Sequence, residues 1–382
     1  TYAQLACFSW YTYALGATLA LLRDDQGTSR WVNSLHGSAA AVGGIIGGLL
    51  TARAIDRWGR GRVLRVGGLL FAAGLLIYSL PGAGPGITMP GLLLVGFVAA
   101  FVLISMNAFL LDHQGAAGPA SLTEANALAS FTGLIGPIVV GIGAATFLGW
   151  RFGIWVIVAG FIAIEIARGR NVNAYGGPGM VARDPDRRRL PRRVYWSLAI
   201  IMCFLATEFC LVYWSADLLR ERASFGPAAA AASLAAVTSG MFVGRSYGSR
   251  LARRMSTDLI LRLSIVVALV GFALAWVPTI GWLILIGLFI TGAGIGVHWP
   301  LGVARAVRAS GGLTDRATAA SSVAGSFAIA IAPFALGFLS DAIGFHVAFL
   351  LVPVFLATAL VLMIVRPVAD TVSGPRVVPV FE

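Results

Sequence analysis

The sequence contains no lysine and few charged residues of any kind. Charged residues make up 12% of its 382 positions, whereas 58% are hydrophobic and the mean hydropathy is +0.86. Soluble globular domains carry about 25% charged residues, so this composition excludes an ordinary soluble domain. Because every basic residue is arginine, the composition is also typical of a GC-rich bacterial genome.

Cysteine and histidine are scarce as well. The three cysteines, Cys7, Cys203 and Cys210, lie in apolar stretches without CxxC spacing, and the four histidines are scattered. A disulfide framework or a metal site needs clustered ligands. We therefore expect no disulfide, no metal site and no organic cofactor. An enzyme would need a cluster of His, Asp or Glu at a membrane face, so we do not expect catalysis.

Apolar runs long enough to cross a membrane recur along the whole chain. A spanning helix needs about 20 apolar residues. Twelve such runs lie at 2–22, 31–55, 63–81, 88–111, 123–148, 150–167, 194–219, 226–251, 258–277, 279–304, 317–340 and 343–366. The sequence thus predicts an all-α polytopic membrane protein with twelve spans.

The positions of the arginines explain the net charge of +12. In a soluble chain such a charge would fit nucleic-acid binding. Here, all but five of the 28 arginines lie in loops or span ends on the same side as the amino terminus; the exceptions are Arg23, Arg30, Arg151, Arg220 and Arg222. Basic loops stay in the cytoplasm, so we expect both termini there and no nucleic-acid partner.

One long polar segment, residues 168–193, divides the chain. It contains Gly, Pro and clustered arginines, which neither cross a membrane nor build a core. We interpret it as a cytoplasmic linker between a six-helix bundle at 1–167 and a second at 194–366, followed by a cytoplasmic tail at 367–382.

The two halves repeat each other at an offset of 196 to 197 residues. Arg53 corresponds to Arg250, and "PIVVG" at 137 corresponds to "PFALG" at 333. Glycines spaced by four recur at matching places in the two halves, which predicts close helix packing, because small residues let membrane helices approach. They are Gly43, Gly44, Gly47, Gly48, Gly240, Gly244 and Gly248.

The stretch "ARAIDRWGRGRVLR" at 52–65 carries a family resemblance. It is similar to the GxxxDRxGRR pattern of the major facilitator superfamily of secondary transporters, with matches at Asp56, Arg57, Gly59 and Arg60. It departs from that pattern at Ala52 and Gly61.

The resemblance implies two pseudo-symmetric six-helix bundles, a central cavity lined by spans 1, 4, 7 and 10, and alternating access to that cavity. It also implies that Asp56, Arg57, Gly59 and Arg60 form a conformational gate.

The leading functional hypothesis is proton-coupled export of small amphipathic or drug-like molecules or metabolites. "LIGPIVVGIG" around Pro137 looks like a motif of exporting branches of the family. A proton gradient would supply the energy, and we expect a monomer in the bacterial inner membrane. The alternative is a proton-coupled symporter that imports a small nutrient. A non-transporting receptor or membrane enzyme is a remote alternative.

Glu208 is the leading candidate for proton coupling. It lies in "FLATEFCLVYW", near the middle of the seventh span. Ionisable groups inside a span are costly and therefore often functional, and a buried carboxyl group binds a proton more readily than an exposed one. The alternative is a glutamate permanently paired between helices.

His298 is the second candidate. It lies in the tenth span beside Trp299 and Pro300. Histidine titrates in the physiological range, so His298 could share a proton with Glu208. A hydrogen bond to a neighbouring helix explains it equally well.

Aromatic and small polar residues on the cavity spans are candidates for substrate binding. Aromatic rings suit apolar, aromatic or cationic substrates, although single rings also serve in membrane-interface belts. The candidates are Trp10, Tyr11, Tyr13, Ser105, Asn107, Phe204, Tyr213, Trp214 and Trp299.

Asp112 and Arg308 form a candidate inner gate. At the repeat offset, Asp112 in the first half corresponds to Arg308 in the second. An ion pair between them would close the cytoplasmic side. Solvated helix ends are the alternative interpretation.

Asp56 provides a test of the gate. The counterpart stretch "SRLARRMSTDLILR" at 249–262 has Arg253 where Asp56 stands, so the acid belongs to one half only. We predict that Asp56→Asn leaves insertion and folding intact but slows transport, measured as initial flux in proteoliposomes. A flux equal to that of the wild type would mean that residues 52–65 act only as a topology signal.

Overall fold

The computed structural model describes residues 2–113, 118–169, 189–251 and 254–367. Within this part of the chain the regular structure is helical, as predicted. The helices are α1 (Tyr2–Gln26), α2 (Arg30–Trp58), α3 (Arg60–Tyr78), α4 (Pro85–His113), α5 (Gly118–Ala144), α6 (Arg151–Arg168), α7 (Arg192–Ala223), α8 (Pro227–Ala232), α9 (Leu234–Leu251), α10 (Thr257–Trp276), α11 (Gly281–Ile295), α12 (His298–Ser310), α13 (Thr314–Ile343), α14 (Phe345–Ala348) and α15 (Leu351–Val365).

Each helix or broken helix pair corresponds to one of the twelve expected spans. Three expected spans of the second half are interrupted, giving the pairs α8 and α9, α11 and α12, and α14 and α15. Ten helical stretches of the described chain are long and apolar enough to cross a membrane by length and composition. Helices satisfy their own backbone hydrogen bonds, which a chain in lipid requires.

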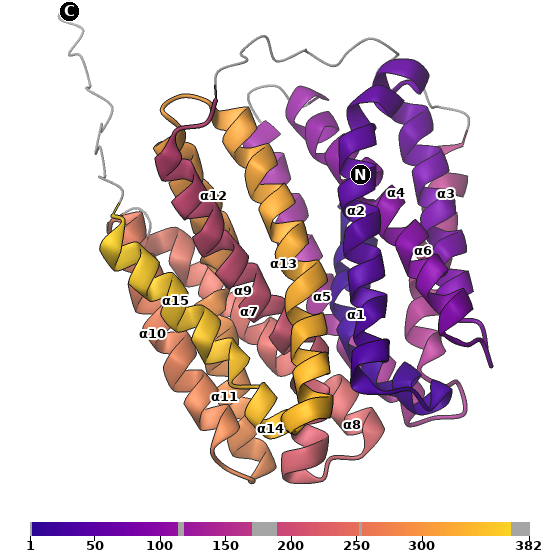
Figure 1. Ribbon diagram of the computed structural model, residues 1–382. Helices are drawn as coiled ribbons and strands as arrows, with labels where there is room; N and C mark the ends of the chain where they lie inside the picture. Colours follow the sequence, from indigo (N-terminus) through magenta and orange to yellow (C-terminus); the bar gives the residue numbers. More distant parts are fainter. Residues whose placement is uncertain (1, 114–117, 170–188, 252–253, 368–382) are drawn as a thin grey trace, which may run out of the picture.

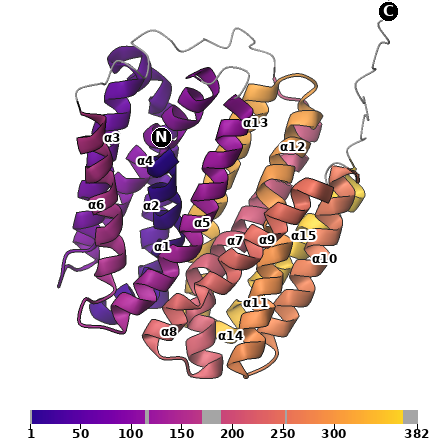
Figure 2. The same cartoon turned by 180° about the vertical axis from the view of Figure 1, so that it is seen from behind.

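The helices form two bundles that lie side by side, α1–α6 and α7–α15 (Figures 1 and 2). In the first bundle α4 packs on α2 and α3, and α1 packs on α5. In the second, α11 packs on α9 and α10, and α7 packs on α13. The equivalent helices of the two halves thus make equivalent contacts, as the sequence repeat predicts.

Glycines at matching positions allow the closest of these contacts. A Cβ atom on Gly43 or Gly47 would lie 2.1 or 2.0 Å from a backbone oxygen of α4, that of Leu93 or Phe97 respectively. In the second half, a Cβ atom on Gly240 or Gly244 would lie 2.0 or 2.1 Å from a backbone oxygen of α11. The predicted role of these glycines in helix packing is confirmed for these four.

The bundles meet along three sets of helices: α1 with α7, α2 with α13, and α5 with α8 and α9. At the first contact a Cβ atom on Gly16 would lie 2.1 Å from the carbonyl oxygen of Val212. At the second, the hydroxyl group of Ser38 donates a hydrogen bond to the carbonyl oxygen of Ala330 at 2.6 Å.

Neighbouring glycines of α2 provide a matched test of this packing. Gly47→Ala places a methyl group against the backbone of α4, whereas a Cβ atom on Gly48 has no atom within 4 Å. Overpacking typically costs about 1–3 kcal/mol, so we expect Gly47→Ala to lower the thermal unfolding midpoint in detergent.

Gly48→Ala should leave that midpoint unchanged or raise it slightly, since alanine favours helix over glycine. Equal midpoints for the two variants would contradict the close approach of α2 and α4.

Candidate functional site

Glu208 is buried near the middle of α7, at the interface between the bundles. Its side chain is 9% exposed. The hydroxyl group of Tyr13, on α1 of the other bundle, donates a hydrogen bond to Glu208 Oε1 at 3.5 Å. The other buried acids of the described chain, Glu165, Asp217 and Asp258, lie near helix ends. The structure therefore places Glu208 where the sequence predicted an acid at mid-membrane.

Arg245 on α9 is the cation nearest to this carboxyl group. Its Nη2 lies 4.0 Å from Glu208 Oε1, and the same nitrogen donates a hydrogen bond to the Tyr13 hydroxyl at 3.3 Å. The side chain is 32% exposed, so it is only partly enclosed. Glu208, Tyr13 and Arg245, which we call the central triad, bring together three helices from both bundles.

Sequence reasoning missed Arg245. It falls among the arginines expected in loops or span ends, because several other bases follow it closely in the chain. A signal was present, since Arg245 lies six residues before the end of α9, inside the apolar run 226–251. An arginine at that depth in a span is a functional candidate for the same reason as Glu208.

The break between α11 and α12 holds Arg245 in place. The carbonyl oxygen of Gly296 would normally accept the backbone N–H four residues on, but that residue is Pro300, which has none. Arg245 Nε instead donates to Gly296 O at 3.2 Å. The guanidinium group thus satisfies a carbonyl group that the proline leaves free.

His298 begins α12 immediately after this break. Its ring is fully buried and stacks on Phe204 of α7, with 4.0 Å between ring centroids. Within the described part of the chain neither ring nitrogen has a hydrogen-bond partner. The structure therefore does not show the predicted proton sharing with Glu208; Phe204 instead covers the imidazole.

Two predicted substrate-binding tyrosines lie at the interface between the bundles. Tyr13 belongs to the central triad. Tyr213 packs its ring edge against Gly37 of α2, where an added Cβ atom would lie 2.3 Å from the ring. Tyr213 also meets the ring of Phe209 edge-on, at 5.7 Å between centroids.

Four other predicted aromatic residues contact helices of their own bundle. Trp10 Nε1 donates to the carbonyl oxygen of Gly153 on α6, and Tyr11 meets the Phe71 ring of α3. Trp214 Nε1 donates to a backbone carbonyl of α13, and the ring of Trp299 packs on that helix. Trp10, Tyr11 and Trp214 therefore contribute to helix packing rather than to the central triad.

The two predicted polar residues of α4 differ in burial. Ser105 is fully buried and Asn107 is half-buried. No described residue accepts or donates a hydrogen bond to Ser105 Oγ or to Asn107 Oδ1. Their predicted role in substrate binding stays a prediction.

The four family-motif residues lie where α2 turns into α3. Gly59 ends α2 with φ of 78°, a conformation that favours glycine. Arg57 is exposed, Arg60 is buried, and Asp56 is half-buried. Among described side chains, none forms a hydrogen bond or ion pair with the Asp56 carboxylate.

The structure describes only one partner of the predicted Asp112–Arg308 gate, since the side chain of Asp112 lies outside the described residues. Arg308 interacts within its own bundle: Nη1 donates to Thr257 Oγ1 at 2.7 Å, and Nη2 lies 3.9 Å from Asp258 Oδ1. The gate pair therefore stays a prediction.

Buried charges at the linker end, where α6 ends at Arg168 and α7 begins at Arg192, join helices of one bundle. In the second bundle, fully buried Arg305 binds Asp258 at 3.1 Å and Ser197 at 2.8 Å. In the first, Glu165 of α6 pairs with Arg65 of α3 at 3.5 Å, and Arg168 of α6 donates to Gln4 of α1 at 2.7 Å. These clusters hold helix ends together within each bundle.

Ion pairs at the far end, where α1 ends at Gln26 and α7 at Ala223, cross between the bundles. They join Arg23 to Asp217, Arg220 to Asp24, and Arg30 to Glu221. The Arg220–Asp24 pair spans 2.8 Å. These three pairs, the far-end clamp, come from the matching stretches "LLRDD" at 21 and "LLRER" at 218, from Asp217 just before the second stretch, and from the start of α2.

Comparison with known proteins decides the family. The model of the Major Facilitator Superfamily matches residues 3–281 and again 197–378, which together cover most of the chain. The chain belongs to the major facilitator superfamily. No curated protein sequence matches it. The resemblance seen in the motif at 52–65 is thus confirmed at the level of the superfamily.

Solved structures of superfamily transporters share the fold of the chain. A point mutant of the nucleoside transporter NupG is 11% identical, with a TM-score of 0.77 and coverage of 96% of this chain and 98% of that one. A bacterial homologue of the lysosomal transporter Spinster, inward-facing and occupied, is 14% identical, with a TM-score of 0.72 and coverage of 96% and 94%. The transporter FucP in the outward conformation is 16% identical, with a TM-score of 0.60 and coverage of 96% and 99%.

The far-end clamp yields a test of conformational control in this superfamily member. Arg30→Gln with Arg220→Gln removes the two partly exposed pairs between the bundles. Exposed pairs contribute about 0.2–1 kcal/mol each, so we expect the far end to open several-fold more often. The measurement is maleimide labelling of Ser38→Cys, at the interface of α2 and α13, with the three native cysteines replaced by alanine.

Arg151→Gln is the matched control, because Arg151 binds Asp25 of its own bundle at 2.8 Å. It should leave the labelling rate of the Ser38→Cys thiol unchanged. The same increase in both variants would mean that the pairs between bundles do not control opening.

Proposed function

We propose that the protein is a proton-coupled secondary active transporter in which Glu208 binds the proton. The supporting observation is the central triad: a buried carboxyl group contacts Tyr13 of the opposite bundle and lies 4.0 Å from Arg245. A proton on Glu208 changes a contact between the very elements that must move in alternating access. The protonation state of Glu208 is therefore coupled to the relative position of the two bundles.

The role of Arg245 follows from charge balance. With Glu208 ionised, the guanidinium group and the buried carboxylate attract each other more strongly than they would in open water, since water reaches only part of the Arg245 side chain. Protonation of Glu208 removes its negative charge, so the positive charge of Arg245 is no longer balanced by it. The Arg245 side chain stays hydrogen-bonded to Gly296 O through Nε. The freed Nη atoms then attract an anionic group on the substrate.

This charge balance favours symport of a small organic anion. An anion binds beside Arg245 most favourably when Glu208 is neutral, so proton and substrate bind together and cross together. A cationic substrate would instead meet the positive charge of Arg245. The geometry therefore favours the alternative given by the sequence, a proton-coupled symporter that imports a small nutrient.

Export by antiport is the second candidate. Its support is the exporter-like stretch around Pro137, which lies inside α5, and α5 packs against α8 and α9 of the other bundle. An exporter of amphipathic or drug-like molecules would bind substrate and proton in turn. The two candidates differ in which side of the membrane must be acidic to drive accumulation.

We also propose that the structure is the inward-facing state. The far-end clamp closes one side, and the arginine-rich loops favour a cytoplasmic position for the opposite, linker end. The higher TM-score with the inward-facing Spinster homologue than with outward FucP supports this proposal. An inward-facing state also agrees with the Asp56 carboxylate, which has no partner among the described side chains, since the family resemblance implies that this acid pairs when the cavity faces outward.

Transport in proteoliposomes tests the proposal. A thermal-shift screen of anionic and cationic amphipaths first identifies compounds that stabilise the purified protein. These compounds then serve as the substrates in the transport assay. We expect uptake against a gradient when the vesicle exterior is acidic. In Glu208→Gln accumulation should be lost, whereas exchange of labelled for unlabelled substrate should persist, because the glutamine mimics the protonated acid.

Asp25→Asn is the control, an acid at the end of α1 whose ion pair with Arg151 lies within its own bundle, and it should keep proton-driven accumulation. Accumulation driven only by an acidic vesicle interior would establish antiport instead. Accumulation against a gradient by Glu208→Gln would refute the coupling role of Glu208.

A further inference from the structure

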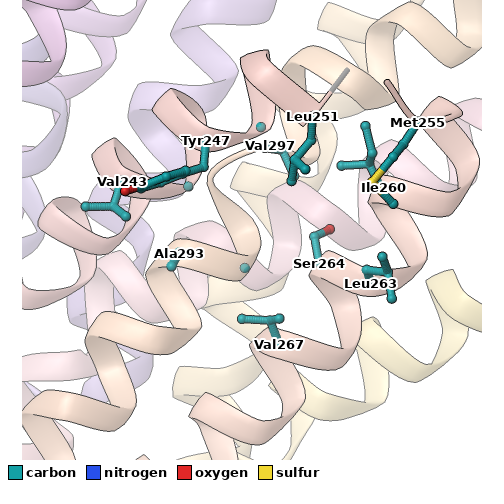
Figure 3. A pocket seen from close by; sticks show the side chains of 13 residues that line it. Val243, Tyr247, Leu251, Met255, Ile260, Leu263, Ser264, Val267, Ala293 and Val297 are labelled. Atoms are coloured by element: carbon teal, nitrogen blue, oxygen red, sulfur yellow. The ribbon is translucent and has the colours of Figure 1, made fainter. Parts of the chain in front are cut away.

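An apolar groove lies between helices of the second bundle, lined by residues other than those of the central triad (Figure 3). It encloses about 230 Å³ between α9, α10 and the break after α11. Tyr247, Leu263 and Val267 on its rim are 60%, 49% and 41% exposed, so the groove faces the surroundings of the bundle. In a membrane those surroundings are lipid.

The groove forms because small residues leave space between the helices. Gly244 and Gly248 of α9, together with Ala293 and Gly294 of α11, present little or no side chain to it. Ser264 is the one hydroxyl group on its α10 wall, and it already donates to the carbonyl oxygen of Leu261 at 2.8 Å. The walls thus offer almost no free polar group, which fits an alkyl chain and disfavours a polar solute.

Two exposed arginines lie at the linker end of this groove. The guanidinium carbon of Arg250 lies 5.5 Å from the centre of the Tyr247 ring, which lines the groove. Arg254 is exposed and immediately precedes the lining residue Met255. The acid nearest to them in the sequence, Asp258, is buried and bound to Arg305. The two bases are therefore not neutralised by that acid.

We propose that this groove binds an anionic phospholipid. One acyl chain fills the apolar groove, and the phosphate group binds Arg250 and Arg254 at the level where α9 ends and α10 begins. Basic residues beside a pocket between membrane helices attract anionic head groups. Both parts of the ligand, chain and head group, match a feature of the surface, and the site is independent of the transport proposal.

Native mass spectrometry of the full chain tests the site. Detergent-solubilised protein is mixed with phosphatidylglycerol or phosphatidylcholine of identical acyl chains. We expect phosphatidylglycerol to be retained preferentially, and retention to fall about tenfold in Arg250→Gln with Arg254→Gln, because each base near the membrane surface contributes to attraction. Val267→Trp, which fills the groove, should lower retention with both bases intact.

Arg53→Gln with Arg62→Gln is the matched control, since these exposed arginines occupy the corresponding helix ends of the first bundle. It should retain phosphatidylglycerol as the wild type does. An equal loss in this control would overturn the site and assign retention to general surface charge. Equal retention of both lipids by the wild type would also overturn it.

Two further measurements complete the test. Circular dichroism confirms that each variant keeps its helicity, and Leu263→Trp, on the same rim, replaces Val267→Trp if that variant unfolds. The mass spectra also report the oligomeric state. A dimer that disappears on filling the groove would assign it to a second copy of the chain and overturn the lipid site.

Discussion

Two opposite charges in the middle of a membrane-spanning bundle set the constraint on which this protein depends. An isolated ion in the lipid interior is unstable by several kcal/mol, so Glu208 and Arg245 need one another and the Tyr13 hydroxyl group between them. Because Tyr13 belongs to the other bundle, the stability of the charges depends on how the bundles are docked. A change in the charge of Glu208 therefore changes the docking energy of the bundles.

The rest of the fold keeps that docking adjustable. Within each bundle, glycines bring helix backbones into direct contact, and buried clusters around Arg305 and Glu165 tie helix ends together. Between the bundles, two of the three ion pairs of the far-end clamp are partly exposed and contribute little stability individually. Strong contacts within bundles and weak contacts between them suit two rigid bodies that rock against each other.

The outer surface has a separate chemistry. The groove beside Tyr247 is apolar along its length and basic at one end. The first bundle also carries arginines at the equivalent helix ends, as the repeat predicts. The two halves keep the same helix contacts, yet their surfaces and their interior charges have diverged. Arg245 shows this most clearly, because the repeat offset places it opposite Gly48 of the first half.

The sequence by itself determined the twelve spans, their division into two bundles, the superfamily and the position of Glu208. Hydrophobic length, glycine spacing and one acid at mid-span are local properties, which the chain carries residue by residue. The partners of Glu208 were decided by tertiary structure. Tyr13 and Arg245 lie far from it in the chain and meet it only where α1, α7 and α9 cross. The same packing turned Trp10 and Trp214 toward neighbouring helices. It also enclosed His298 against Phe204. Which residues face one another across helices depends on the relative rotation and crossing of those helices, and no single stretch of sequence encodes these.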